Sequence, residues 1–174
     1  IALVDSLGPG GAEQSTAAVV VPLAEAGVDV SMILLKRTDD GYEREVTRAG
    51  ISMRSLAATH PIGRVRELRR ILRRERPDVL HTALYTSDQL GRVAAAGLPV
   101  RTISTLVNVP PTSSLTASTT TRWKGQLAQQ IDRLTGRMLV DRFHAVTPGV
   151  ASEYVARYGF STDRITVVER GRDG

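Results

Sequence analysis

The chain has 174 residues, of which 41% are hydrophobic and 4% aromatic, and its formal net charge is +5 at pH 7. This length and apolar content suit one globular domain and exclude a disordered chain. Cysteine is absent, which excludes disulfides and thiolate metal sites, and no apolar stretch reaches the roughly 18 residues of a membrane span. His60, His81 and His144 lack the spacing of metal ligands, so we expect a cytoplasmic protein without a metal.

The chain opens with a strand, a glycine-rich turn and a helix. The apolar run Ile1–Val4 leads into Leu7–Glu13 (LGPGGAE), and an apolar-periodic segment follows over Ala12–Ala26. Glycine lets the backbone approach a ligand closely, and a helix N-terminus attracts anions such as phosphates. The spacing matches neither GxGxxG nor GxxxxGK[ST]. The turn is therefore either a phosphate-facing loop or a tight turn that needs glycine only for its conformation.

Apolar, β-branched runs alternate with helical patterns along the rest of the chain. The expected strands are Ile1–Ser6, Val28–Leu35, Ile51–Ser55, Val79–Thr82, Thr102–Leu106, Phe143–Val146 and Ile165–Val168. The expected helices are Ala12–Ala26, Tyr42–Ala49, Ile62–Glu75, Ser87–Ala96, Arg122–Leu139 and Gly149–Tyr158. Such βα repeats predict a Rossmann-like, doubly wound α/β fold, with a mostly parallel sheet and helices on both faces. Its ligands would bind beyond the carboxyl ends of the strands.

One segment interrupts this alternation. Residues Asn108–Thr121 are rich in proline, serine and threonine, which predicts a loop. Because the segment follows a strand, the loop would lie over the ligand face. A functional flap and a simple connection both fit.

The positive charge is concentrated in the Ile62–Glu75 helix. Seven arginines and two glutamates lie between Ile62 and Arg76, and the rest of the chain is balanced. At ~100° per residue, one side of the helix is apolar, and the opposite side carries Arg66, Arg69, Arg70, Arg73 and Arg74. A solvated charged face and attraction to an anionic membrane surface both remain open. Nucleic-acid binding is disfavoured, because no aromatic stacking platform accompanies the arginines.

Four stretches, in order along the chain, resemble the N-terminal domain of GT-B glycosyltransferases of the large retaining family often called glycosyltransferase family 4. Gly10–Glu13 (GGAE) resembles the glycine-rich loop after the first strand, and Arg76–His81 (RPDVLH) resembles the entry into a central strand. Phe143–Val150 (FHAVTPGV) resembles a later strand and helix start. Ile165–Asp173 (ITVVERGRD) resembles the crossing into the second domain.

The resemblance implies that residues 1–174 form the acceptor-side half of a GT-B fold, with the donor-binding C-terminal domain absent. The chain begins inside a strand and ends just after another apolar run, which also leads us to expect a fragment. The implied reaction moves a sugar from a nucleotide-sugar to a hydroxyl acceptor, such as a lipid-linked or cell-envelope glycan. No cofactor or metal is expected, and the isolated chain should be inactive. The protein would be cytoplasmic or peripheral on the inner face of the plasma membrane.

The resemblance also implies site residues. Gly10, Gly11 and Glu13 would lie near the donor diphosphate and the acceptor, although Glu13 at a helix start could serve only the helix dipole. Val107 stands where many members have a histidine, and valine cannot hydrogen-bond; the catalytic residue is therefore unknown, with Asn108 as a substitute. The implied acceptor-side residues are Tyr85, Ser104, Thr105, Asn108 and Thr147. Arg170, at the domain crossing, would meet a phosphate or remain an exposed charge.

Two other functions stay open. A nucleotide-sugar epimerase or dehydrogenase is disfavoured, because GxGxxG is absent and neither Tyr85 nor Tyr154 has a lysine four residues on. A non-catalytic α/β binding module of the sensor type would need acidic residues at the strand ends, where Asp5 stands alone. His81, at the end of a central strand, either faces the cleft or is a hydrogen-bonded histidine near the core.

Overall fold

A computed structural model describes residues 1–38, 40–107 and 119–168. Within them, seven strands form one sheet in the order β3-β2-β1-β4-β5-β6-β7, and every neighbouring pair is parallel. The strands are β1 (Ala2–Val4), β2 (Ser31–Leu34), β3 (Ser52–Ser55), β4 (Val79–Ala83), β5 (Arg101–Leu106), β6 (Arg142–Ala145) and β7 (Ile165–Val167). The predicted Rossmann-like α/β fold is thereby confirmed.

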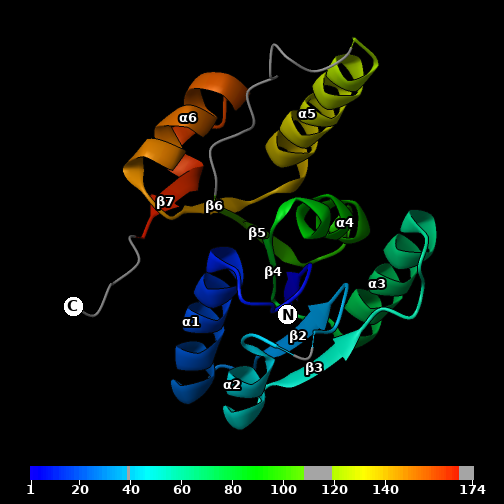
Figure 1. Cartoon of the computed structure of the whole chain (residues 1–174), viewed down its shortest axis with the longest axis vertical. Coiled ribbons are helices and arrows are strands. Elements are labelled where there is room, and N and C mark those ends of the chain that lie inside the picture. The colour runs from blue at the N-terminus through cyan, green and yellow to red at the C-terminus, as the bar shows by residue number, and fades with distance from the viewer. Residues whose placement is uncertain (39, 108–118, 169–174) are drawn as a thin grey trace.

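The helices cover both faces of this sheet (Figure 1). They are α1 (Gly11–Glu25), α2 (Glu43–Arg48), α3 (Pro61–Glu75), α4 (Tyr85–Ala95), α5 (Thr119–Leu139) and α6 (Pro148–Tyr158), with a 3₁₀ turn η1 (Thr162–Arg164) before β7. Successive side chains of a strand point to opposite faces. Accordingly, Ala2 and Val4 pack with α1 and α2, whereas Leu3 packs with α3 and α4.

A separate apolar cluster holds the β6–β7 end of the sheet. The rings of Phe143 in β6 and Phe160 after α6 stack with their centroids 4.3 Å apart, and Tyr158 meets Phe160 edge-on at 5.5 Å. Such ring pairs add to the stabilisation that burial itself provides. This cluster fixes α6 on the side of the sheet that α4 and α5 cover.

Two helix starts differ from the prediction by more than one residue. Helix α5 begins at Thr119, so the predicted loop is wrong over Thr119–Thr121, and its remainder, residues 108–118, lies outside the described residues. Helix α4 begins at Tyr85, directly after Leu84, whose φ is 77°. That backbone conformation ends β4 abruptly, and the next residue is already helical.

The strand order fixes where a ligand would lie. The chain runs outward from β1 to β2 and β3, then returns to β4 on the other side of β1. Ligands of open α/β sheets bind beyond the carboxyl ends at this reversal of order. The glycine-rich turn follows β1 and Leu84 follows β4, so both lie at this edge.

Candidate functional site

The glycine loop (Leu7–Gly11) is held in place by the turn after β2. The carbonyl oxygen of Leu7 accepts a hydrogen bond from the Tyr42 N–H at 2.8 Å. Gly41 has a φ of 91°, and a Cβ there would lie 2.2 Å from the same Leu7 oxygen. Only glycine satisfies both the conformation and the space. The loop is therefore positioned by a second, distant glycine.

The carboxylate of Glu13 lies against this loop. A Cβ on Gly10 would stand 2.2 Å from Glu13 Oε2, so the absence of a side chain at Gly10 makes room for the carboxylate. Glu13 is in the first turn of α1, where negative charge is favourable. This placement fits the helix-dipole alternative for Glu13.

Asp5 joins the end of β1 to the start of α4. Its Oδ1 accepts hydrogen bonds from the Ser87 N–H at 2.8 Å and from the Ser87 hydroxyl at 2.5 Å. The carboxylate thus satisfies an N–H group in the first turn of α4. The acidic residue that a sensor-like module would need is engaged in a structural cap.

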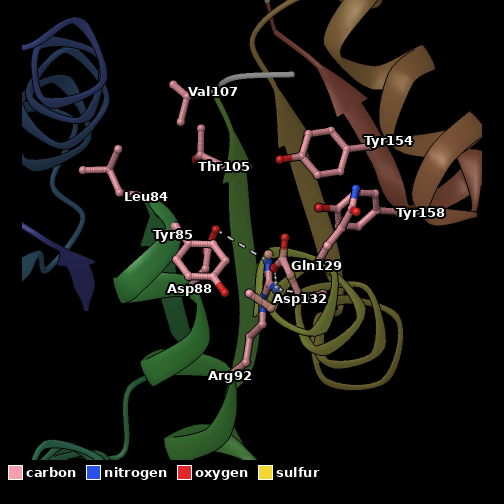
Figure 2. A pocket seen from close by; sticks show the side chains of 12 residues that line it. Leu84, Tyr85, Asp88, Arg92, Thr105, Val107, Gln129, Asp132, Tyr154 and Tyr158 are labelled. Carbon is pink, nitrogen blue, oxygen red and sulfur yellow. Dashed lines mark hydrogen bonds and ion pairs between the residues drawn. The ribbon is translucent and has the colours of Figure 1, made fainter. Parts of the chain in front are cut away.

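A cavity of about 370 Å³ opens beside the carboxyl ends of β4 and β5, among α4, α5 and α6. This volume lies within the range of small-ligand sites. Figure 2 shows Tyr85, Tyr154 and Tyr158 around it, with Thr105 near the carboxyl end of β5 and Val107 just after that strand. We refer to this cavity as the tyrosine pocket.

Charged side chains form the floor of the tyrosine pocket. Arg92 is only 2% exposed, and its guanidinium lies 2.6 Å from Asp132 Oδ1 and 3.5 Å from Asp88 Oδ2. Gln89 Nε2 donates to the same Asp132 oxygen at 2.7 Å, and the Thr82 hydroxyl donates to Asp88. Two carboxylates thus face one guanidinium, which gives the floor a net negative charge.

Burial changes the protonation of these groups. Desolvation raises the pKa of Asp88 to about 6, against the opposing effect of the Arg92 charge. Desolvation also raises the pKa of Tyr158 to about 12 and that of Tyr154 above its ordinary value. Both phenols therefore stay protonated at neutral pH and remain hydrogen-bond donors.

Backbone strain lies at the wall of the pocket. Leu84, which lines the cavity, has φ 77° and ψ 151°. Residues other than glycine rarely adopt this backbone conformation, and it costs them about 1–3 kcal/mol. Such strain persists where the surrounding structure enforces it and clusters at binding and catalytic sites. It is an independent indication that this edge of the sheet is functional.

The structure brings some of the predicted acceptor-side residues together. Tyr85 and Thr105 line the tyrosine pocket, and Val107 adds an apolar wall. Ser104 is fully buried, and its hydroxyl lies 2.9 Å from that of Thr82. Thr147 caps α6, because its hydroxyl oxygen accepts from the Val150 N–H at 3.2 Å.

Asn108 and Arg170 lie outside the described residues. His81 Nε2 lies 2.6 Å from the Thr105 hydroxyl, and burial lowers the pKa of His81 to about 4. The structure thus favours the second reading of His81, a neutral, hydrogen-bonded histidine in the sheet.

Sequence reasoning missed the charged floor and two of the tyrosines. Asp88 and Arg92 are four residues apart on α4, which is the one local signal of an ion pair. Their partner Asp132 comes from α5, and Tyr154 and Tyr158 come from α6. No spacing along the chain links these three helices.

The arginine face of α3 is partly engaged. The exposed members are Arg66, Arg70, Arg73 and Arg74. Arg69 instead donates to the carbonyl oxygens of Ala94 at 2.9 Å and Ala96 at 2.7 Å. A cation at the C-terminus of α4 stabilises its unpaired carbonyls, so Arg69 joins two helices.

Comparison with solved structures finds the same fold in sugar-nucleotide enzymes. HepE of Anabaena, solved with UDP, has a TM-score of 0.75 at 13% identity, over 99% of this chain and 44% of HepE. The lipopolysaccharide outer core galactosyltransferase WaaB has a TM-score of 0.66 at 14% identity, over 99% of this chain and 46% of WaaB. The UDP-GlcNAc 2-epimerase of Methanocaldococcus jannaschii has a TM-score of 0.59 at 13% identity, over 97% of this chain and 45% of the epimerase.

The chain thus spans less than half the length of each of these three proteins. No functionally curated protein matches the sequence. The model of the family described as "Glycosyl transferase 4-like domain" matches residues 10–171, which is nearly the whole chain. The chain therefore belongs to the glycosyl transferase 4-like domain family, and its fold is that of one half of a GT-B glycosyltransferase.

Proposed function

We propose that this chain is the acceptor-side domain of a retaining glycosyltransferase that moves a sugar from a nucleotide-sugar to a hydroxyl of its acceptor. The family match over residues 10–171 carries the proposal. HepE, half of which this fold resembles, was solved with UDP and with UDP-glucose, so UDP-sugars are the first donors to test. A C-terminal domain beyond these residues would hold most of the nucleotide.

In this proposal the glycine loop faces the donor diphosphate. The first turn of α1 offers its positive dipole end to the negative charge that develops on the leaving UDP. The Glu13 carboxylate now lies against Gly10 and would swing aside, which a side chain with three rotatable bonds does readily. The loop itself stays fixed, because Gly41 and Tyr42 hold Leu7.

The tyrosine pocket is the proposed acceptor site, and its charge favours a neutral acceptor. Asp88 and Asp132 outnumber Arg92 on the floor, so a phosphate or carboxylate entering the pocket would meet net repulsion. Carboxylates accept hydrogen bonds from hydroxyl groups. An uncharged sugar with several hydroxyls fits this floor.

The aromatic walls support the same conclusion. Tyr154 and Tyr158 offer ring surface and, with their raised pKa values, hydroxyl donors. Figure 2 shows the Tyr154 hydroxyl directed into the pocket. Aromatic faces combined with a few fixed polar groups orient a ligand whose surface is part apolar and part hydroxyl.

Replacing Tyr154 by phenylalanine tests the pocket as the acceptor site. The ring that stacks on Phe160 at 5.6 Å is kept, and only the hydroxyl is lost. In the full-length protein we expect the acceptor KM to rise about two- to tenfold, the effect of one neutral hydrogen bond, with the donor KM unchanged. Tyr42→Phe, in the cluster on the opposite face, is the matched control. Equal acceptor KM values in both variants would exclude this role.

A nucleotide-sugar epimerase is the second candidate, because UDP-GlcNAc 2-epimerases share the fold at a TM-score of 0.59. The family match and the higher TM-score of HepE, 0.75, favour the transferase. The two functions differ in their products. A transferase releases UDP and extends an acceptor, whereas an epimerase returns an isomer of the UDP-sugar.

Retention and metal independence also remain proposals. Retention predicts that the anomeric configuration of the transferred sugar is the same in donor and product, which NMR of the product measures.

In the described part of the chain, no three His, Asp or Glu side chains cluster as metal ligands. We expect chelation by EDTA to leave turnover unchanged; lost turnover that Mg²⁺ restores would contradict metal independence.

A membrane-bound acceptor and a location on the inner face of the plasma membrane were expected from the arginine face. Both remain proposals. No helix in the described part of the chain is both long and apolar enough to cross a bilayer.

A further inference from the structure

The floor of the tyrosine pocket carries one more negative charge than its own side chains balance. Asp88, Arg92 and Asp132 are the charged residues among the described ones that line the cavity. The Arg92 guanidinium, 2.6 Å from Asp132 and 3.5 Å from Asp88, shares its single charge between the two carboxylates. Burial raises the pKa of Asp88 to about 6, so this carboxyl is still largely ionised at neutral pH. One negative charge therefore remains for a ligand to balance.

The phenols of Tyr85, Tyr154 and Tyr158 indicate the sign of the potential inside the pocket. Burial raises the pKa of all three, and at each of them the Asp132 charge is the next largest effect in the same direction. The Arg92 charge lowers the pKa of Tyr85 and Tyr154, but by less than Asp132 raises it. A phenol resists ionisation where the potential is negative. The potential is thus negative at positions on both α4 and α6.

The aromatic walls favour a cation as well. Figure 2 shows the three tyrosine rings around the space next to Asp132. The rings of Tyr154 and Tyr158 are tilted by 54° with their centroids 5.0 Å apart, so they present differently oriented surfaces. The face of an aromatic ring attracts a cation, and several rings together recognise ammonium groups. The rings and the carboxylates therefore favour the same kind of ligand group.

Uncharged hydrogen-bonding groups lie beside these charges. Gln129 of α5 and Thr105 of β5 line the same cavity as the phenols. Amides and hydroxyls both donate hydrogen bonds to sugar hydroxyls and accept hydrogen bonds from them. A simple amine would make no use of these groups. A ring that carries both hydroxyls and an ammonium group would use them together with the carboxylates.

We propose that the acceptor held in the tyrosine pocket is an amino sugar, with its ammonium group beside Asp88 and Asp132 and its hydroxyls toward Gln129 and the phenols. A neutral sugar also fits the pocket, but it leaves the extra carboxylate charge without a counterion. A negative site also favours the protonated form of an amine. The role of this sugar as acceptor rests on the transferase function proposed above, whereas the preference for an ammonium group rests on the pocket alone.

Calorimetric titration of the full-length protein, near neutral pH and without a donor, tests this preference. The probes are methyl glucoside and its amino derivatives, in which an amine replaces one hydroxyl at a time. Each amine is compared with its N-acetyl derivative, which lacks the charge. We expect at least one amine to bind about tenfold more tightly than methyl glucoside, which is the difference between a charged and a neutral hydrogen bond. Its N-acetyl derivative should lose this gain.

The variant Asp132→Asn tests the origin of the gain. It replaces the carboxylate by an amide of nearly the same shape, so that the charges of Asp88 and Arg92 balance each other. The gain should fall to about two- to threefold, the contribution of the rings. Glu153→Gln is the matched control, because Glu153 pairs with Arg157 on α6 and does not line the pocket. This control should keep the tenfold gain.

Tyr85 tests the aromatic contribution without a change to the ion pairs. It is 53% exposed, so its substitution should leave the fold intact. Tyr85→Leu should reduce the gain about two- to fivefold, the effect of a cation over an exposed ring. Tyr85→Phe, which keeps the ring, should retain the gain. A gain that is the same in both variants would contradict the aromatic part of the proposal.

Equal affinity for methyl glucoside and for every amine would overturn the proposal, as would a gain that Asp132→Asn and Glu153→Gln retain alike. Ethanolamine is the last probe, because it carries the ammonium group without a sugar ring. If it bound as tightly as the best amino sugar, the site would be one for amines in general, which would also overturn the proposal. These titrations contain no donor, so their failure would leave UDP release with neutral acceptors as a separate test of the transferase function. Tight binding of an amino sugar without any UDP release would contradict the transferase function alone.

Discussion

Arg92 holds a full positive charge in the interior of the protein. Its guanidinium is 2% exposed and depends on Asp132 at 2.6 Å and Asp88 at 3.5 Å. A buried charge is tolerated only when its partners replace the lost hydration. The same contacts join α4 to α5 and form the floor of the tyrosine pocket, so stability and site geometry rest on one side chain.

Removing the partner of Arg92 should therefore be costly. We expect Asp132→Ala to lower the free energy of unfolding by about 3 kcal/mol, because the buried guanidinium loses its nearer carboxylate and keeps only that of Asp88, at 3.5 Å. Glu153→Ala, which breaks the exposed pair with Arg157 at 2.6 Å, should cost less than about 1 kcal/mol. Urea denaturation followed by circular dichroism measures both. Similar small losses in the two variants would contradict the role given to Arg92.

His81 makes stability depend on pH. Burial first, and then the charge of His144, lowers its pKa from an ordinary 6.5 to about 4. Between these values the unfolded chain binds a proton that the folded chain does not. The contribution of neutral His81 is therefore complete above pH 6.5 and is lost as the pH falls toward 4.

The variant His81→Gln should remove this dependence. Between about pH 7.5 and about pH 5, we expect the wild type to lose about 2 kcal/mol more unfolding free energy than the variant. Asp88, whose raised pKa of about 6 acts in the opposite direction, is present in both proteins and cancels in the difference. Parallel pH profiles would show that His81 titrates normally in the folded state.

At the scale of elements, every strand of the described sheet overlaps a predicted one, because most of them lie in short runs rich in apolar and β-branched residues. The predicted start of α4, Ser87, is two residues too late. The residue before the helix is Leu84, which turns the chain with φ 77° and does not cap the helix with its side chain, so the sequence carries no capping signal there. It also read Thr119–Thr121 as loop, because threonine is a poor helix former. The helical pattern in the sequence starts at Arg122, three residues after the observed start of α5 at Thr119.

The site divides in the same way. The glycine loop is local, so its position between β1 and α1 could be predicted from composition alone. The floor of the tyrosine pocket could not be predicted in this way. Arg92 of α4 and Asp132 of α5 are 40 residues apart in the sequence, with β5 between their helices, and they meet only in the folded chain. Likewise, nothing near Gly41 in the sequence shows that it supports Leu7.

The support that Gly41 gives to the glycine loop can be tested by substitution. Gly50 is the matched control: its φ is 76° and a Cβ there would meet nothing within 4 Å, whereas at Gly41 (φ 91°) it would lie 2.2 Å from Leu7 O. We expect Gly50→Ala to cost about 1–2 kcal/mol of unfolding free energy from strain alone. Gly41→Ala should cost about 1–3 kcal/mol more, because the loop must move. Equal losses would show that the turn does not hold the loop.

At the scale of the whole molecule, our proposal makes this chain one wall of a cleft between two domains. The glycine loop and the tyrosine pocket lie at the same carboxyl edge of the sheet, while HepE and WaaB are more than twice as long as the segment matched here. Catalysis requires contacts that are stronger in the transition state than in the bound substrates. In our proposal the two domains share those contacts, so residues 1–174 alone should show no measurable turnover.

The most direct test of the central claim is UDP release by the full-length protein. Each member of a panel of UDP-sugars is supplied with neutral sugar acceptors, and UDP and the products are followed by chromatography and mass spectrometry. We predict that one donor yields UDP together with an acceptor extended by one sugar, and that Asp132→Asn, which alters the charge of the pocket floor, weakens acceptor use more than donor use. Conversion of a UDP-sugar into its isomer, with no UDP released and no acceptor extended, would contradict the account.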